Sequence, residues 1–119
     1  MFNITLYARA PSINLCYRRK NSPTGESKSK IFKHTISFQL NNHISELPSF
    51  TPFSTDISIS LVFHLSTKRS VDLDNLIKVT LDSFNNILFT DDKIITNINA
   101  TRVLDSTVDK IDVNIISNT

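Results

Sequence analysis

Paired carboxylates bracket one amphipathic segment in the C-terminal half of the chain. The stretch SVDLDNLIKVT, residues 70–80, places Asp72 and Asp74 one residue apart at the start of an apolar-periodic run. Asp91 and Asp92 follow the end of that run. Hard divalent cations such as Mg²⁺ take oxygen ligands, usually a few carboxylates with water and substrate phosphate. The four aspartates therefore predict a metal site that could activate water against a phosphodiester.

Helix capping is the competing interpretation of the first pair. An aspartate at a helix start accepts hydrogen bonds from unpaired amides and complements the helix dipole. Capping accounts for only one of these two aspartates, so it does not explain the presence of the other. Asp74, Lys78 and Asp82 recur every four residues and share one polar helix face, either as a salt-bridge ladder or with Lys78 facing a phosphate. The second pair, taken alone, is more typical of a turn than of a metal site.

Other cation and nucleotide motifs are excluded. An EF-hand loop beginning at Asp72 needs Gly at its sixth position and Glu at its twelfth, where this chain has Ile77 and Ser83. The single glycine rules out P-loops and dinucleotide fingerprints, so no nucleotide cofactor is expected. The three histidines have no zinc-ligand spacing, and the one cysteine cannot form an internal disulfide.

Length and charge are typical of one small globular domain, residues 1–119. No apolar run approaches the roughly 18 residues of a membrane span, so a soluble, intracellular protein is expected. Residues 1–70 hold nine Lys/Arg and three Asp/Glu, whereas residues 71–119 hold four and eight. This asymmetry suits an anionic ligand held by bases on one side and through metal on the other, or simple charge complementarity between two faces.

Hydrophobic periodicity predicts six elements in the order β-α-β-α-β-β, an α/β (α+β) fold with a mixed sheet of about four strands and two helices. The last two strands are expected to pair antiparallel across a tight turn. The expected elements are a strand at 2–9, a basic loop at 11–30, a helix from Ser29 to about 47, a strand at 57–65, a basic loop at 66–71, a helix of about 14 residues carrying the apolar stripe 76–88, and strands at 94–104 and 108–116.

Two segments together resemble one nuclease family. Residues 72–95, DLDNLIKVTLDSFNNILFTDDKII, resemble the core motif of RusA-type Holliday junction resolvases, D-x-D-N-L-x-K-x-x-x-D followed by D-D before a strand. Residues 10–19, APSINLCYRR, resemble that family's P-S-x-N-x-x-Y-R segment. The chain departs from the pattern at Val71, where a basic residue is common, and at Ala10, where a second proline is common.

The resemblance implies a homodimeric endonuclease, dependent on Mg²⁺ with Mn²⁺ as a substitute, that makes paired nicks in four-way DNA junctions during recombination and repair. It implies 5′-phosphate products. Asp72, Asp74 and Asp92 would be catalytic metal ligands, Asp91 an accessory ligand, and Lys78 a contact to the scissile phosphate. The implied DNA-binding residues are Asn14, Tyr17, Arg18, Arg19, Lys20, Lys68, Arg69 and Asn75.

Two other functions fit the same residues. One is a nuclease directed to flaps or forks, and the other is a non-catalytic DNA-binding protein whose aspartates only cap a helix. The metal site also sets a geometric requirement, because Asp92 must come beside Asp72 and Asp74 across a helix about 20 Å long. The fold must meet that requirement within one subunit or across a dimer.

Overall fold

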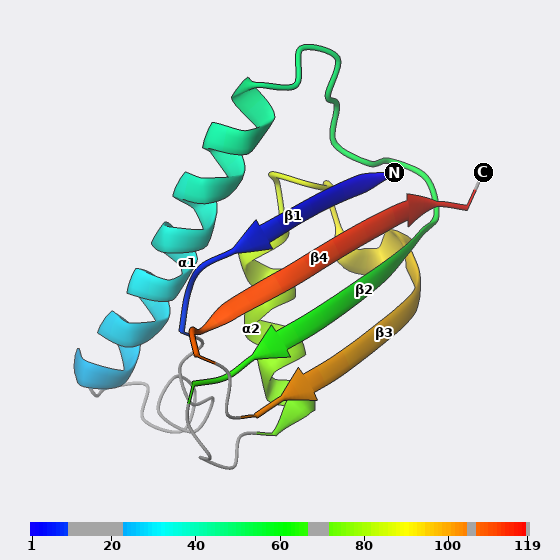
Figure 1. The fold of residues 1–119 in the computed structure, drawn as a ribbon. Coiled ribbons are helices and arrows are strands. Elements are labelled where there is room, and N and C mark those ends of the chain that lie inside the picture. Colours follow the sequence, from blue (N-terminus) through cyan, green and yellow to red (C-terminus); the bar gives the residue numbers. More distant parts are fainter. Residues whose placement is uncertain (10–22, 67–71, 105–106, 119) are drawn as a thin grey trace.

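The computed structural model describes residues 1–9, 23–66, 72–104 and 107–118, with side chains in the first helix described from residue 30. It confirms the expected α+β class and the order β-α-β-α-β-β. The described residues form four strands and two α-helices, and Figure 1 shows how they are arranged. The elements are β1 (Phe2–Leu6), α1 (Pro23–Ser45), β2 (Ile57–His64), α2 (Leu73–Phe84), a 3-10 helix (Asp92–Ile94), β3 (Ile95–Val103) and β4 (Lys110–Ser117).

The sheet has the strand order β1-β4-β2-β3, which corrects the expected pairing of the last two strands. β3 runs parallel to β2, and β4 runs antiparallel to both β2 and β1, so β2 separates the two strands expected to form a hairpin (Figure 1). The reason is burial: β2 has an alternating apolar face that is almost fully buried, and a central position gives it a neighbour on each side. Alternation predicts which residues face the core, but not which strand lies beside which.

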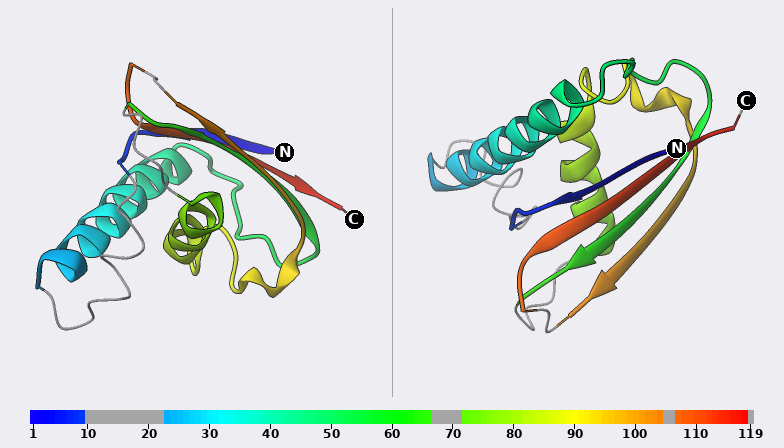
Figure 2. Two further views of the ribbon diagram at one scale, coloured as in Figure 1. Left: turned by 90° about the horizontal axis from the view of Figure 1, so that it is seen from below. Right: turned by 45° about the horizontal axis from the view of Figure 1, so that its top comes forward.

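Both helices cover the same face of the sheet, and the opposite face is open (Figure 2). Ile59, Leu61 and Phe63 of β2 are each about 1% exposed, and they point toward the helices. Leu76 and Val79 of α2 are buried to the same degree, so this helix is held against the sheet by its apolar stripe. None of the helices in the described part of the chain is long and apolar enough to cross a membrane.

Two helix boundaries differ from the prediction. α1 begins at Pro23, so residues 23–30 are helical rather than part of the expected loop, because proline is well suited to the first turn of a helix. α2 ends at Phe84, before the last residues of its predicted apolar stripe. Asn86 has a φ of 68°, a left-handed conformation that asparagine tolerates and that stops helices. Ile87 and Leu88 therefore lie in the turn after the helix, and they pack against the core from there.

Polar side chains connect three strands across the open face. Asp112 of β4 accepts a hydrogen bond from the Thr5 hydroxyl of β1 at 2.8 Å. His64 Nε2 of β2 lies 2.8 Å from the other oxygen of Asp112. Asn3 and Asn114 are also hydrogen-bonded across β1 and β4. Burial raises the pKa of Asp112, but the hydrogen bonds from His64 and Thr5 outweigh that effect and hold the pKa below its ordinary value.

Asp112→Asn should destabilise the fold at neutral pH by about 0.5–1.5 kcal/mol, because it removes the charged acceptor of two hydrogen bonds. A lowered pKa means that the carboxylate stabilises the native state above the ordinary value of 3.8 and loses this contribution as the pH falls through the folded pKa. The difference from the wild type, measured by urea denaturation between pH 3 and pH 7, should therefore become smaller toward the acid end. A difference independent of pH, matching that of Glu46→Gln at an exposed control position, would contradict this account.

Candidate active site

Asp72 is the N-cap residue of α2, but its side chain caps no helix amide. Its backbone carbonyl accepts the hydrogen bond of the Leu76 N–H at 3.1 Å. Its carboxylate instead lies 3.4 Å from the side-chain nitrogen of Asn75, which donates to it. Capping therefore does not explain the exposed Asp72 carboxylate, and Asn75 orients that carboxylate as well as being a predicted DNA contact.

The polar face of α2 runs along the exposed side of the helix, as its spacing predicts. Asp74 and Lys78 are exposed, and Asp82 is partly buried one turn further on. Lys78 thus lies between the acidic start of the helix and Asp82. Lys78 therefore puts a positive charge on this face, and the apolar stripe on the opposite side of α2 packs against the core.

Asp91 and Asp92 form a second, locally organised acidic pair. The Asp91 carboxylate accepts a hydrogen bond from the Lys93 N–H at 3.0 Å, so it caps the 3-10 helix. That bond and a hydrogen bond with Asp92 hold the pKa of Asp91 below its ordinary value. The same bond with Asp91, some desolvation, and the charges of Asp91 and Asp82 raise the pKa of Asp92. Asp91 therefore serves as a cap, and Asp92 is the member of the pair whose pKa is raised.

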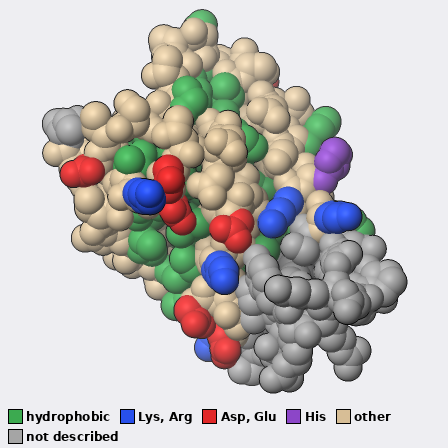
Figure 3. All heavy atoms as spheres, turned by 180° about the vertical axis from the view of Figure 1, so that it is seen from behind, with side chains coloured by type: hydrophobic (Ala, Val, Ile, Leu, Met, Phe, Trp, Pro, Cys, Tyr) green, Lys and Arg blue, Asp and Glu red, His purple; other side chains and the backbone are tan. Residues whose placement is uncertain are grey.

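The two acidic pairs do not converge within one chain. Among the side chains that the structure describes, no three His, Cys, Asp or Glu lie close enough together to hold a metal ion. Asp72 and Asp74 stand at the start of α2, and Asp91 and Asp92 lie beyond its end. Figure 3 shows the helical face, where acidic side chains occur in separate groups with Lys and Arg side chains between them. One chain therefore holds the two halves of the predicted metal site apart, as two half-sites.

Asp82 is the neighbour of Asp92 that sequence reasoning left without a role. Its charge contributes to the raised pKa of Asp92. The signal was present in the sequence, because Asp82 is the last acidic residue of the polar face and precedes the turn that leads to Asp91.

The predicted DNA-binding residues are mostly outside the described part of the chain. Asn75 is described, and it lies beside Asp72. Arg9, Lys30 and Lys78 provide described and exposed positive charge in addition. The predicted contacts that lie outside the described residues are Asn14, Tyr17, Arg18, Arg19, Lys20, Lys68 and Arg69.

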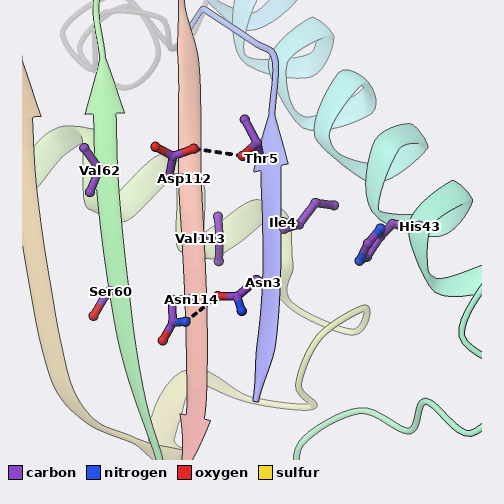
Figure 4. A pocket seen from close by; sticks show the side chains of 9 residues that line it. All are labelled: Asn3, Ile4, Thr5, His43, Ser60, Val62, Asp112, Val113 and Asn114. Atoms are coloured by element: carbon purple, nitrogen blue, oxygen red, sulfur yellow. Dashed lines mark hydrogen bonds between the residues drawn. The ribbon is translucent and has the colours of Figure 1, made fainter.

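A hollow of about 610 Å³ on the open face of the sheet is a weaker candidate for a hydrolytic site. Figure 4 shows Thr5, Asp112, Asn3 and Asn114 pointing into it, with hydrogen bonds joining them in pairs. Asp112 is the one carboxylate in its lining, and this carboxylate is already engaged by Thr5 and His64. The hollow thus offers no carboxylate pair for a metal. Its lining is Asn3, Ile4, Thr5, His43, Ser60, Val62, Asp112, Val113 and Asn114.

Asp82→Asn should lower the pKa of Asp92 toward its ordinary value, because one of the charges that oppose its ionisation is removed. Carboxyl NMR titration of the two proteins without metal measures the change. Glu46→Gln removes a charge at an exposed position on a different element and should leave the Asp92 titration where it is. An equal shift in both variants would mean that Asp82 exerts no specific influence on Asp92.

Comparison with known proteins agrees with the two motifs. A search of curated proteins found no match. The family model described as endodeoxyribonuclease RusA matches residues 10–116 of the 119-residue chain, a span that includes both segments and every aspartate discussed above. The chain therefore belongs to the RusA endodeoxyribonuclease family.

Proposed function

We propose that this protein is a Mg²⁺-dependent endonuclease that resolves four-way DNA junctions by paired phosphodiester hydrolysis in recombination and repair. One observation carries the proposal: within a RusA-family chain, the exposed Asp72 carboxylate caps no amide and is instead oriented by Asn75. A side chain held in this way is available for a ligand. Mg²⁺-dependent hydrolysis of this kind is expected to make paired cuts in the junction and to leave 5′-phosphate ends.

The donor chemistry fits Mg²⁺, with Mn²⁺ as a substitute. Carboxylate oxygens are the ligands that hard divalent cations prefer. Asp92 resists ionisation because Asp91 and Asp82 are near it, and a bound cation would relieve that repulsion. The residues that would hold the ion are Asp72, Asp74 and Asp92, with Asp91 as an accessory ligand. The ion would supply an activated water and neutralise charge that develops on the phosphodiester.

The separation of the two half-sites favours a symmetric homodimer. α2 spans about 18 Å, so its two ends cannot contribute to one ion in the same subunit. A two-fold axis near the middle of α2 would place the start of this helix in one copy beside the end of the same helix in the other copy. Asp72 and Asp74 of one copy then approach Asp91 and Asp92 of the other, and the operation creates two equivalent sites. Two sites are also what paired cleavage of a junction needs.

The remaining residues of the face bind and orient the DNA. Asn75 fixes the Asp72 carboxylate through its hydrogen bond. Lys78, one turn above Asp74, contacts the scissile phosphate and neutralises the leaving oxygen. Arg18, Arg19, Lys68 and Arg69 hold the phosphate backbone, and backbone contacts of this kind are independent of base sequence, as a branched substrate requires.

Asp74→Asn and Asp92→Asn should each reduce cleavage of a synthetic four-way junction by more than about 100-fold. Each removes a metal ligand, and the loss of outer-shell partners alone costs 10–100-fold in comparable sites. The assay measures nicking in Mg²⁺, with Mg²⁺ omitted and EDTA added in a parallel reaction. Glu46→Gln is the control for a lost carboxylate and should cut at the wild-type rate.

Linear duplex and flap substrates separate the alternatives in the same assay. A preference for flaps over four-way junctions would identify a branch nuclease of another specificity. Binding of the junction without cutting, in Mg²⁺ and in Mn²⁺, would identify a non-catalytic DNA-binding protein. Full-rate cleavage by Asp74→Asn would refute the assignment of the metal ligands.

A further inference from the structure

An exposed phenylalanine distinguishes the outer face of α1. Phe38 is 63% exposed, whereas the other seven phenylalanines, all of which lie in the described part of the chain, are buried or half-buried. Ile31 precedes Phe38 by seven residues, which is two helical turns, so it shares this face, and it is 65% exposed. Single apolar side chains on a surface are ordinary, but two large ones on one helix face indicate a contact surface.

The direction of this face is fixed by the packing of the opposite side of α1. Three apolar side chains, spaced every four residues and at most 2% exposed, hold the helix against the core: Phe32, Ile36 and Leu40. Gln39 attaches the helix to the chain beyond β1, because its side-chain oxygen accepts from the Tyr7 N–H at 2.8 Å and its side-chain nitrogen donates to the Tyr7 carbonyl at 2.8 Å. Phe38 is therefore presented outward by a helix that is already fixed before any partner binds.

Positive and hydrogen-bonding side chains accompany the apolar pair. Lys30, His34 and Phe38 follow one another at intervals of four residues, and all three are exposed. Lys33 adds a second, half-buried ammonium group. Among the side chains of α1 that the structure describes, residues 30–45, none is acidic. Figure 3 shows Lys or Arg side chains next to a His side chain on the helical side of the molecule. The face therefore suits an anionic partner that also offers flat apolar surface.

DNA with unstacked bases has both of these properties. Proteins that bind such strands combine positive charge, which contacts the phosphates, with aromatic side chains on which bases stack. In a regular duplex the faces of nearly every base are covered by its neighbours, so an exposed ring gains little contact there. At the branch point of a junction the stack is interrupted, and base faces become accessible to a ring.

The outer face of α1 is also close to the candidate active site. α1 and α2 pack against each other on one face of the sheet (Figure 2). The axes of packed helices are about 8–10 Å apart. DNA that contacts Lys78 on the exposed face of α2 is therefore within reach of α1 as well.

We propose that the outer face of α1 is a stacking surface for the unstacked bases of branched DNA. Phe38 and Ile31 contact the faces of bases at the branch point. Lys30 and His34 contact the adjacent phosphates. None of these four side chains belongs to the predicted metal site, so they contribute to recognition of the branch and not to hydrolysis. The inference rests on the proposed function for the class of substrate, but it is tested by binding without cleavage.

A tryptophan at position 38 reports stacking directly. The protein contains no tryptophan, so Phe38→Trp introduces a single indole. With EDTA present to prevent cleavage, titration with a synthetic four-way junction should quench the indole fluorescence, because the ring stacks on a base. A linear duplex of the same length and base composition should leave the fluorescence unchanged.

Phe38→Ala should weaken binding of the four-way junction by about 10-fold, as expected for the loss of one base–aromatic stack, and leave binding of the linear duplex unchanged. Phe38→Tyr keeps the ring and should bind the junction as the wild type does. Ile116→Ala is the matched control, because Ile116 is an apolar residue of β4 that is 47% exposed, and it should change neither affinity. Lys30→Gln should weaken binding of both DNAs and reduce the salt slope by about 1.

Equal junction affinities of the wild type and Phe38→Ala, or equal quenching of the indole by duplex and junction, would overturn the stacking surface. A lower sedimentation coefficient of Phe38→Ala without DNA would also overturn it, because this face would then pack against another protein chain.

Junction cleavage in Mg²⁺ is read separately. Junction-specific quenching in Phe38→Trp without cleavage by the wild type refutes the proposed function and leaves the stacking surface standing. Cleavage by both proteins without quenching of the indole refutes the stacking surface and leaves the proposed function standing.

Discussion

The packing of α2 against the sheet is the constraint on which the site depends. Leu76, Val79 and Phe84 are buried to within about 1% exposure, so the helix is fixed in position and direction. A helix of this length is a rigid rod of about 18 Å, with Asp72 and Asp74 at its start and Asp91 and Asp92 beyond its end. No side-chain rearrangement closes such a distance. The core therefore keeps the acidic pairs of one chain apart, and the proposed metal site, which uses both pairs, requires a second subunit.

Keeping the pairs apart also has an energetic benefit for the free subunit. Four carboxylates gathered in one place without a cation repel one another, and the charges of Asp91 and Asp82 already contribute to the raised pKa of Asp92. Asp91 offsets part of the repulsion by capping the 3-10 helix through the Lys93 N–H. If the site is completed between copies, the full repulsion arises only on association, where the cation can balance it. Metal binding and dimer formation are then thermodynamically linked.

Much of this fold could be predicted from periodicity. The alternation in β2 and the apolar stripe of α2 predict the buried residues, and the order of elements is correct. The neighbour of β3 could not be predicted from the tight turn expected at 105–107, because strand order depends on how all the strands compete for the central positions. The early start of α1 at Pro23 was missed because the segment is rich in small polar residues, whereas helix formation there requires no apolar stripe.

The sequence indicates residues for the candidate site but not their geometry. The types and spacing of Asp72, Asp74, Lys78, Asp91 and Asp92 indicate metal chemistry, and the family model covers all five. Sequence spacing could not decide whether the two acidic pairs meet in one subunit. That depends on the direction that the chain takes in the turn after Phe84. The structure places the second pair beyond the far end of α2, where it lies near Asp82.

Subunit complementation tests the shared site most directly. Asp74→Asn and Asp92→Asn chains are each expected to be inactive as homodimers, but a mixed dimer contains one site with no substitution and one site with both. Co-refolded mixtures should therefore regain nicking of four-way junctions, to about a quarter of the wild-type site concentration, because half of the dimers are mixed and each has one intact site. A mixture as inactive as its parents, with mixed dimers demonstrated by mass spectrometry, would contradict the account, since a site built within one chain leaves every site damaged.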